Sequence, residues 1–234
     1  MSDWAPKRFW KSVEIKTVDG GFAVTLDGRN VRTPGKALLA VPTEAMARHI
    51  ANEWEAQTEK VDPRTMPWTR SANSAIDKLS VQRREVEDHL IGYAGTDLVC
   101  YRAESPQGLV ERQAQGWDPI LDNIEKTFGV RFLTASGVMP VPQAPESLDI
   151  LRNVMSEMSD FAITGFHDIV TLSGSYLIAV SVTLKAVEPK AAWQLSRIDE
   201  DWQIEQWGRD EEADAQAETK REAFMHATHF FTSA

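Results

Sequence analysis

IVTLSGSYLIAVSVTL, residues 169–184, decides the fold, because it is the longest uncharged stretch of the chain. It is too short and too rich in Ser, Thr and Gly to cross a bilayer, which takes about 20 mostly apolar residues. Its apolar side chains do not alternate with polar ones, as they would in a half-exposed strand. On a helix they point in most directions, which is typical of a helix buried inside a domain. We therefore predict a central helix over residues 166–185, where Gly174 and Ser175 let a neighbouring helix approach closely.

Apolar residues recur at helical spacing on both sides of this run. The clearest patterns cover residues 71–94, 109–128, 147–161 and 189–202. Pro119 lies inside the second pattern and should kink or break that helix. Residues 129–146 hold three prolines and are predicted to form a long connection, and Gly208 should interrupt the last helical region.

The first 42 residues predict a meander of short strands, because alternating apolar and polar segments are separated by turn signals. These signals are Asp19-Gly20-Gly21, Asp27-Gly28 and Pro34-Gly35. Thr43 then fits the N-cap of an amphipathic helix over residues 44–58. Such a helix can pack on the sheet, which would be marginally stable alone.

These patterns together predict an α+β protein. Residues 1–66 form a small β-rich N-terminal domain with one packed helix, and residues 67–234 form an all-α C-terminal domain built round the buried central helix. Pro63 and Pro67 mark the boundary between the two. The predicted core includes Trp54, Leu151, Phe161, Leu177 and Ile178.

The composition excludes several classes of protein. A content of 42% hydrophobic and 26% charged residues is ordinary for a globular chain of 234 residues. The net charge of −10 argues against nucleic acid or an anionic membrane as a broad partner. The single Cys100 excludes an internal disulfide and a thiolate-rich metal site. The N-terminal ten residues show neither a signal core nor an amphipathic presequence.

No catalytic motif stands out. The chain has no Gly-rich phosphate loop and no Gly-x-Ser-x-Gly elbow. Glu222, His226 and His229 share one helical face and could ligate a metal, but a closed site needs four ligands. We therefore predict a non-enzyme with no catalytic residues, metal or cofactor, and keep a metal-dependent hydrolase using these three residues as the alternative.

The segment from Asp199 to Glu222 is strongly acidic, with ten Asp and Glu against three Lys and Arg, a net charge of −7. It also contains Trp202 and Trp207. One explanation is a solvated helix face whose tryptophans belong to the core. The other is an acidic rim around aromatic anchors, which suits a protein partner with a basic patch.

Short motifs in a fixed order along the chain point to a known family. They are RFWKSVEI, LDGRNVRTPGKALLAVPT, AxxIAxEWxAQ (Ala47 to Gln57), MPWTR, DLVCYR, the WDP of Trp117-Asp118-Pro119, and DEDWQIEQWGRDEEA. Together they resemble the ATP-twelve family, the assembly chaperones that serve the α subunit of the F1 part of ATP synthase. The resemblance covers essentially the whole chain. Its most specific parts are LDGRxVRTP and the Q-x-x-x-WG element, Gln203, Trp207 and Gly208.

The resemblance implies a molecular chaperone that binds the free F1 α subunit without hydrolysing nucleotide. The chaperone would shield the subunit-interface surface of its client until the neighbouring subunit replaces it. The family's small β-containing domain followed by a helical domain agrees with the patterns above. Because the chain begins almost directly at RFW, we expect a bacterial cytoplasmic member or a trimmed form of the mitochondrial matrix. We expect a monomer that does not insert into membranes or bind nucleic acid.

The partner surface is predicted on residues 199–214. Its predicted contacts are Glu200, Trp202, Glu205, Trp207 and Asp210. Glu200 and Trp207 are the leading candidates, because a helix that ends at Gly208 can present a side chain and leave carboxylates in water. The next candidate surface lies around Arg29 and Arg32. A generic holdase is the other non-enzymatic alternative.

Overall fold

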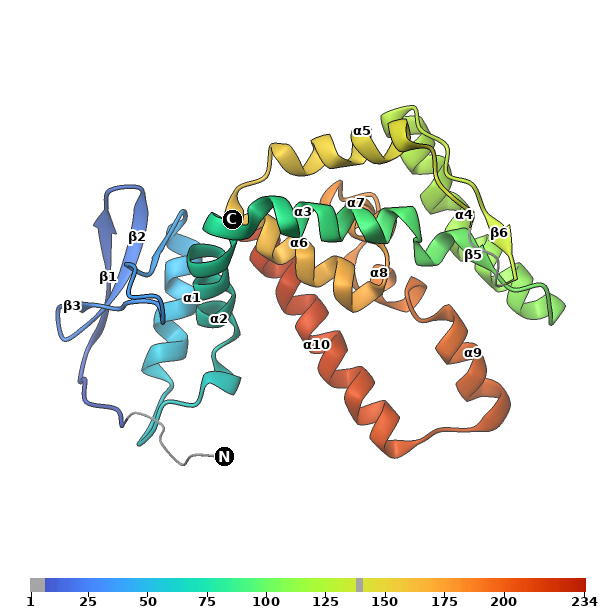
Figure 1. Cartoon of the computed structure of the whole chain (residues 1–234). Helices are drawn as coiled ribbons and strands as arrows, with labels where there is room; N and C mark the ends of the chain where they lie inside the picture. The colour runs from blue at the N-terminus through green and yellow to red at the C-terminus, as the bar shows by residue number, and fades with distance from the viewer. Residues whose placement is uncertain (1–6, 138–140) are drawn as a thin grey trace. The chain divides into compact units, whose positions relative to one another are not determined.

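The computed structural model describes residues 7–137 and 141–234 (Figure 1). Within these ranges the chain divides into two compact units. The first comprises the described residues up to Arg83 with Ser159–Gly165 and His229–Ala234, and the second comprises Arg84–Met158 and Phe166–Thr228. The boundary predicted at residue 66 concerns independently folding domains and stays a prediction. Residues 1–6 of the predicted β-rich domain and 138–140 of the predicted connection lie outside the described residues.

The first unit contains an antiparallel sheet of short strands, as the turn signals predict. The strands are β1 Val13–Val18, β2 Gly21–Leu26, β3 Arg29–Asn30 and β4 Ala40–Val41. Strand β2 is central and pairs with the other three, with Ile15 of β1 opposite Val24. Gly21 has a φ of 146°, and a Cβ there would lie 2.2 Å from the carbonyl oxygen of Val41, so only glycine fits this position.

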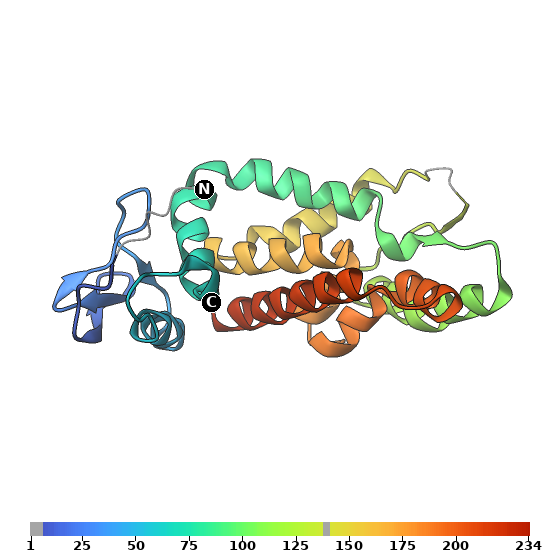
Figure 2. The same ribbon diagram turned by 90° about the horizontal axis from the view of Figure 1, so that it is seen from below.

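Helix α1, Glu44–Glu55, covers one face of this sheet (Figures 1 and 2). The Thr43 hydroxyl accepts a hydrogen bond from the backbone N–H of Met46 at 3.3 Å, which confirms the predicted N-cap. Met46 and Ile50 are buried with Trp10 in the core of the unit. The predicted burial of Trp54 and Phe161 is wrong, because both pack at the margin of this core and stay partly exposed.

The helix predicted over residues 71–94 is interrupted. It consists of α2 Pro67–Ser74, the π-helical turn η2 Ala75–Leu79 and α3 Ser80–Gly95, and short 3-10 turns, η1 Pro63–Thr65 and η3 Leu98–Cys100, lie on either side. The Ser80 hydroxyl donates to the carbonyl of Ile76 at 2.7 Å, and Gln82 leaves helical geometry with φ −121° and ψ 17°. A hydroxyl that bonds the backbone competes with the regular helical ladder, which accounts for a break here.

The second unit is mostly helical. The remaining helices are α4 Gln107–Phe128, α5 Pro145–Ser156, α6 Asp160–Ser173, α7 Tyr176–Thr183, α8 Pro189–Leu195, α9 Ile198–Trp207 and α10 Glu211–Ser233; a parallel pair of two-residue strands, β5 Tyr101–Arg102 and β6 Ala135–Ser136, accompanies them. Helix α4 continues through Pro119 instead of breaking there. The patterns over 147–161 and 189–202 each span a helix break. In the described residues, no helix is both long and apolar enough to span a membrane.

The predicted central helix is two helices, α6 and α7. Gly174 adopts a φ of 71°, which ends α6, and its N–H still bonds the carbonyl of Val170 at 2.8 Å. Ser175 then caps α7 by accepting the N–H of Ile178 at 2.9 Å. All seven residues from Tyr176 to Val182 are buried, with α4 and α8 packed against α7. The α+β fold class with a buried helix in its helical part is therefore confirmed, and the predicted length of that helix is wrong.

Asp97 fixes the start of the buried helix. It comes from the DLVCYR motif and is fully buried. Its carboxylate accepts the Ser175 hydroxyl at 2.5 Å, the Leu177 N–H at 2.9 Å and the Val99 N–H at 3.2 Å. Burial raises the pKa of Asp97 to about 6, although these donors favour the charged form. This motif residue therefore has a structural explanation.

Candidate functional site

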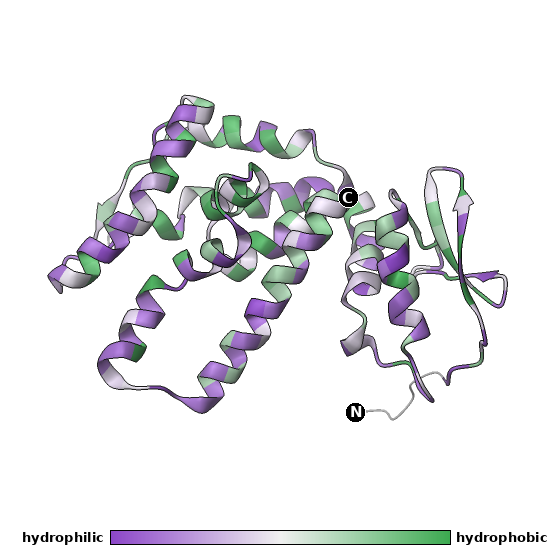
Figure 3. Cartoon of the chain, turned by 180° about the vertical axis from the view of Figure 1, so that it is seen from behind, coloured by the Kyte–Doolittle hydropathy of each residue, from purple (hydrophilic) through white to green (hydrophobic). Residues whose placement is uncertain are grey.

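The five predicted contact residues lie on α9 and on the turn that joins α9 to α10. The ribbons of α9 and of the first half of α10 are mostly hydrophilic (Figure 3). The five side chains do not form one surface, because α9 presents two different faces. One face packs on α4, and the other lines a groove with α10.

Trp202 and Glu205 belong to the face that packs on α4. The Arg112 guanidinium donates to both Glu205 carboxylate oxygens at 2.8 Å, and it lies 4.9 Å from the centre of the Trp202 ring. This bidentate pair lowers the pKa of Glu205. A Cβ on Gly108 would lie 2.8 Å from the Trp202 ring, so glycine allows the close approach of α4 and α9. These two residues are therefore already occupied by contacts within the chain.

Glu200 and Trp207 on the other side of α9, and Asp210 in the turn after it, line a groove of about 430 Å³. The other lining residues are Arg197, Gln203, Ile204, Gly208, Ala213, Asp214, Gln216, Ala217 and Lys220. Trp207 is 79% exposed, which is unusual for the largest apolar side chain. The structure thus brings together three of the five predicted contacts, and it separates the other two from them.

The turn between α9 and α10 explains how Trp207 is presented. Gly208 has a φ of 93°, and its N–H bonds the carbonyl of Ile204 at 2.9 Å, so α9 ends there as predicted. Asp210 accepts the N–H of Ala213 at 2.8 Å and caps α10. Asp214 pairs with Arg209 at 2.9 Å. Both carboxylates are therefore engaged in holding the turn.

Glu200 differs from its acidic neighbours. Asp199 accepts the side-chain amide of Gln113 at 2.6 Å, and Asp201 pairs with Arg197 at 3.5 Å. Among the described residues, the exposed carboxylate of Glu200 meets no cation and no hydrogen-bond donor. It is the acidic group of the groove that is available to a partner.

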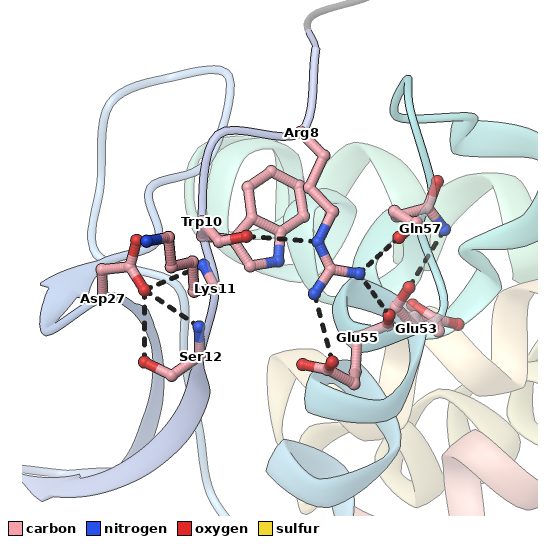
Figure 4. A network of polar contacts seen from close by, with 8 residues as sticks. All are labelled: Arg8, Trp10, Lys11, Ser12, Asp27, Glu53, Glu55 and Gln57. Atoms are coloured by element: carbon pink, nitrogen blue, oxygen red, sulfur yellow. Dashed lines mark hydrogen bonds and ion pairs between the residues drawn. The ribbon is translucent and has the colours of Figure 1, made fainter.

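The motifs of the first unit are used differently. Figure 4 shows Arg8 of the RFW motif closing the C-terminal end of α1, where its guanidinium donates to the carbonyls of Glu55 at 2.8 Å and Gln57 at 2.5 Å. In the same view Asp27 of LDGR accepts the backbone N–H groups of Lys11 and Ser12, each at 2.9 Å. These bonds lower the pKa of Asp27. Both charged motif residues stabilise the fold.

Two further carboxylates of the first unit hold neighbouring segments. Glu53 accepts the N–H groups of Trp68 at 2.6 Å and Thr69 at 2.8 Å, and so caps α2 from α1. Burial raises the pKa of Glu53 despite these bonds. Asp77 accepts the N–H of Gly35 at 2.8 Å in the TPG turn, where a Cβ would clash with its carboxylate. The predicted second surface around Arg29 and Arg32 lies in this part of the chain, and it stays a prediction.

The metal alternative finds no geometric support. Among the described residues, no three His, Cys, Asp or Glu side chains gather as metal ligands. His229 instead lies edge-on to His49 and Trp68, with ring centroids 4.8 and 5.0 Å away. Glu222, His226 and His229 therefore do not form the ligand set that the alternative requires.

The sequence pattern does not indicate the residues that complete these two faces, which are Gly108 and Arg112 on α4 and Ala213 and Ala217 on α10. A signal was present on α9, because Ile198, Trp202 and Glu205 are spaced as one helical face. That spacing separates Trp202 and Glu205 from Glu200 and Trp207.

Comparisons with known proteins agree with this structure. Residues 7–125 match the model of the ATP12 chaperone protein family. The protein "Protein atp12, mitochondrial" of Schizosaccharomyces pombe is 27% identical over 219 residues, which cover 88% of this chain and 75% of that protein. The crystal structure of Atp12 from Paracoccus denitrificans matches with a TM-score of 0.93 at 46% identity, covering 97% of each chain. The Atu1473 protein of Agrobacterium tumefaciens matches with a TM-score of 0.91 at 37% identity, covering 97% of this chain and 86% of that one. The chain belongs to the ATP12 chaperone family.

Proposed function

We propose that this protein is an assembly chaperone for the F1 part of ATP synthase. It binds the free α subunit as a monomer and shields the subunit-interface surface of that client until the neighbouring subunit replaces it. Membership of the ATP12 chaperone family supports the chaperone class, and the motif resemblance points to the α subunit. The related proteins come from a mitochondrion and from bacteria, so the proposed site of action is the bacterial cytoplasm or the mitochondrial matrix.

The observation that carries this proposal is the exposed Trp207, which lines the groove of α9 and α10 together with Glu200, a carboxylate that has no partner in the described part of the chain. An exposed tryptophan next to a charge is typical of an interface anchor. The free client of a ring complex exposes apolar surface that aggregates unless it is covered. Aromatic anchors supply affinity, and a solvated acidic rim supplies selectivity and a fast approach. A chaperone bound through such a contact can be displaced by the neighbouring subunit of the ring.

Binding of the α subunit to a Glu200→Lys variant tests the proposal. Reversing a charge that meets a basic patch should weaken binding at least about tenfold and reduce its salt dependence. Thermal melting should be unchanged, because Glu200 is exposed and an exposed charge alters stability by about 0.5 kcal/mol at most. Glu125→Lys is the matched control, since it reverses an exposed charge on α4 away from the groove.

Two outcomes would contradict the proposal. Unchanged binding by Glu200→Lys would move the contact elsewhere, with the surface around Arg29 and Arg32 next to be tested. Equal suppression of aggregation of the α subunit and of unrelated proteins by the parent would identify a generic holdase instead. Glu205→Lys serves as a second comparison, because it breaks the pair with Arg112 outside the groove and should therefore lower the melting temperature, in contrast to Glu200→Lys.

A further inference from the structure

The groove between α9 and α10 is lined by four apolar side chains together with polar and charged ones. Ile204 and Trp207 come from α9, and Ala213 and Ala217 come from α10, so small side chains on one helix face large ones on the other. Its volume of about 430 Å³ falls within the range of about 300–1,000 Å³ that is usual for sites holding a small ligand. A cavity of this size accommodates a protruding apolar side chain of a partner.

The charged side chains of the groove are mostly neutralised by contacts within the chain. Asp210 caps α10, Asp214 pairs with Arg209, and Arg197 pairs with Asp201. Arg197 also lies 5.7 Å from the centre of the Trp193 ring. The lining charges without such a contact among the described residues are the carboxylate of Glu200 and the ammonium of Lys220.

The charge of the residues around the groove determines whether a basic or an acidic partner segment is favoured. The segment from Asp199 to Glu222 has a net charge of −7, so Lys220 lies within a segment where acidic residues outnumber basic ones by ten to three. A cationic partner is attracted by this net negative charge, whereas an acidic one is repelled. Burial of a partner carboxylate beside Glu200 would in addition place two like charges together.

We propose that this groove holds one large apolar side chain of the client, and that a Lys or Arg next to it in the client segment pairs with Glu200. The inference rests on the proposed function, and it names the chemistry of the client segment: basic and apolar residues side by side. Ile204, Ala213 and Ala217 contact the apolar side chain, and Trp207 covers it. Glu200 then gains a cationic partner, which it lacks among the described residues.

A pair of tryptophan substitutions tests whether the groove must be open. Ala217→Trp fills the groove, whereas Ala215→Trp places the same side chain on an exposed position of α10 that does not line it. The probes are two synthetic amphipathic helical peptides with the same leucine-rich face, flanked by lysines in one and by glutamates in the other. Circular dichroism and thermal melting first establish that both variants fold as the parent does.

We expect the parent to bind the lysine peptide at least about tenfold more tightly than the glutamate peptide. Ala217→Trp should weaken binding of the lysine peptide at least about tenfold, and Ala215→Trp by less than about twofold. Equal binding by the two variants would overturn the proposal. If Ala217→Trp does not fold, Glu200→Gln provides the second test. It should weaken binding of the lysine peptide and should not weaken binding of the glutamate peptide. If Glu200→Gln binds the lysine peptide as tightly as the parent does, the proposal is overturned.

The same variants separate this inference from the proposed function. If the parent binds the lysine peptide through the open groove but does not bind the α subunit, the groove is supported as a docking site and the α subunit is refuted as the client. If the Ala217→Trp and Ala215→Trp variants bind the α subunit equally well, the α subunit is supported as the client and the groove is refuted as its docking site. Titration of the α subunit against the parent and both variants therefore gives the two answers independently.

Discussion

The first unit and the α9–α10 turn both carry motifs of the family, but they use them in opposite ways. In the first unit, Arg8, Asp27 and Glu53 bond backbone groups of the same chain. In the Q-x-x-x-WG element, the Trp207 side chain faces solvent, and Glu200 nearby has no partner among the described residues. Motifs of equal clarity in a sequence can therefore record a folding requirement in one place and, in another, leave exposed the side chains that we propose for partner binding.

Among the charged residues of the motifs, the largest effect on stability is expected from Asp97→Ala. The substitution leaves the Leu177 N–H and the Ser175 hydroxyl buried without their acceptor. We expect the free energy of unfolding to fall by about 3 kcal/mol, as buried unsatisfied donors cost about 1–3 kcal/mol each. Urea unfolding followed by circular dichroism measures it. Asp122→Ala on α4 is the exposed control and should change stability by about 0.5 kcal/mol at most. A similar loss in both variants would contradict a structural role specific to Asp97.

Glu53→Ala should have the next largest effect. It removes the acceptor of two N–H groups at the start of α2, and we expect a loss of about 2 kcal/mol, comparable to the loss of a strong cap. The control is Glu55→Ala on the same helix, where an exposed pair with Arg8 is lost at a cost of about 1 kcal/mol at most. Thermal and urea unfolding of both variants decide the ranking. If the Glu53→Ala protein is as stable as the Glu55→Ala protein, the claim that Glu53 stabilises the fold of the first unit is contradicted.

A smaller effect is expected from pH. Burial and the nearby His229 lower the pKa of His49, which stacks on Trp68 with ring centroids 4.0 Å apart. A lowered histidine pKa means that the unfolded chain binds the proton more readily, so stability is lost as pH falls below about 6.5. Melting temperatures between pH 8 and pH 5 should therefore fall less steeply in His49→Gln than in the parent. Identical slopes would show that His49 does not contribute.

The smallest effect on stability is expected from Trp207→Ala. Because its side chain is exposed, the free energy of unfolding should change by about 0.5 kcal/mol at most. Trp117→Ala is the matched contrast: its ring is buried and its Nε1–H donates to the carbonyl of Leu195 at 2.8 Å. That variant should lose about 3–5 kcal/mol. If Trp207→Ala unfolds as readily as Trp117→Ala, the tryptophan of the motif is a core residue and the comparison fails.

Periodicity predicted the architecture well and the helix ends less well. The meander, the helix after Thr43 and the burial of Leu177 and Ile178 follow from local patterns and caps. The break at Gly174 does not follow from periodicity, because a segment that is apolar all round shows no change of phase where one helix ends and the next begins.

The candidate site could be located in the sequence but not resolved into its faces. The acidic run with two tryptophans predicted a partner surface on α9, which stays a prediction, and the predicted helix end at Gly208 is confirmed. The two faces of α9 are distinguished by the contact of Glu205 with Arg112, which lies 93 residues earlier in the sequence. Contacts between distant segments of this kind have no local signal, so Trp202 and Glu205 could not be separated from Glu200 and Trp207 on charge and aromaticity alone.

Cys100, the one cysteine of the chain, is 1% exposed, and burial raises its pKa to about 12. Thiol reagents attack the accessible thiolate, so this side chain is inert at neutral pH. A cysteine introduced at Ala215, which is exposed on α10 and does not line the groove, would then be the sole reactive thiol of the molecule. A fluorophore attached there would label one position without any need to remove the native residue, and the arrival and departure of a client could be followed as a change of light emission in real time.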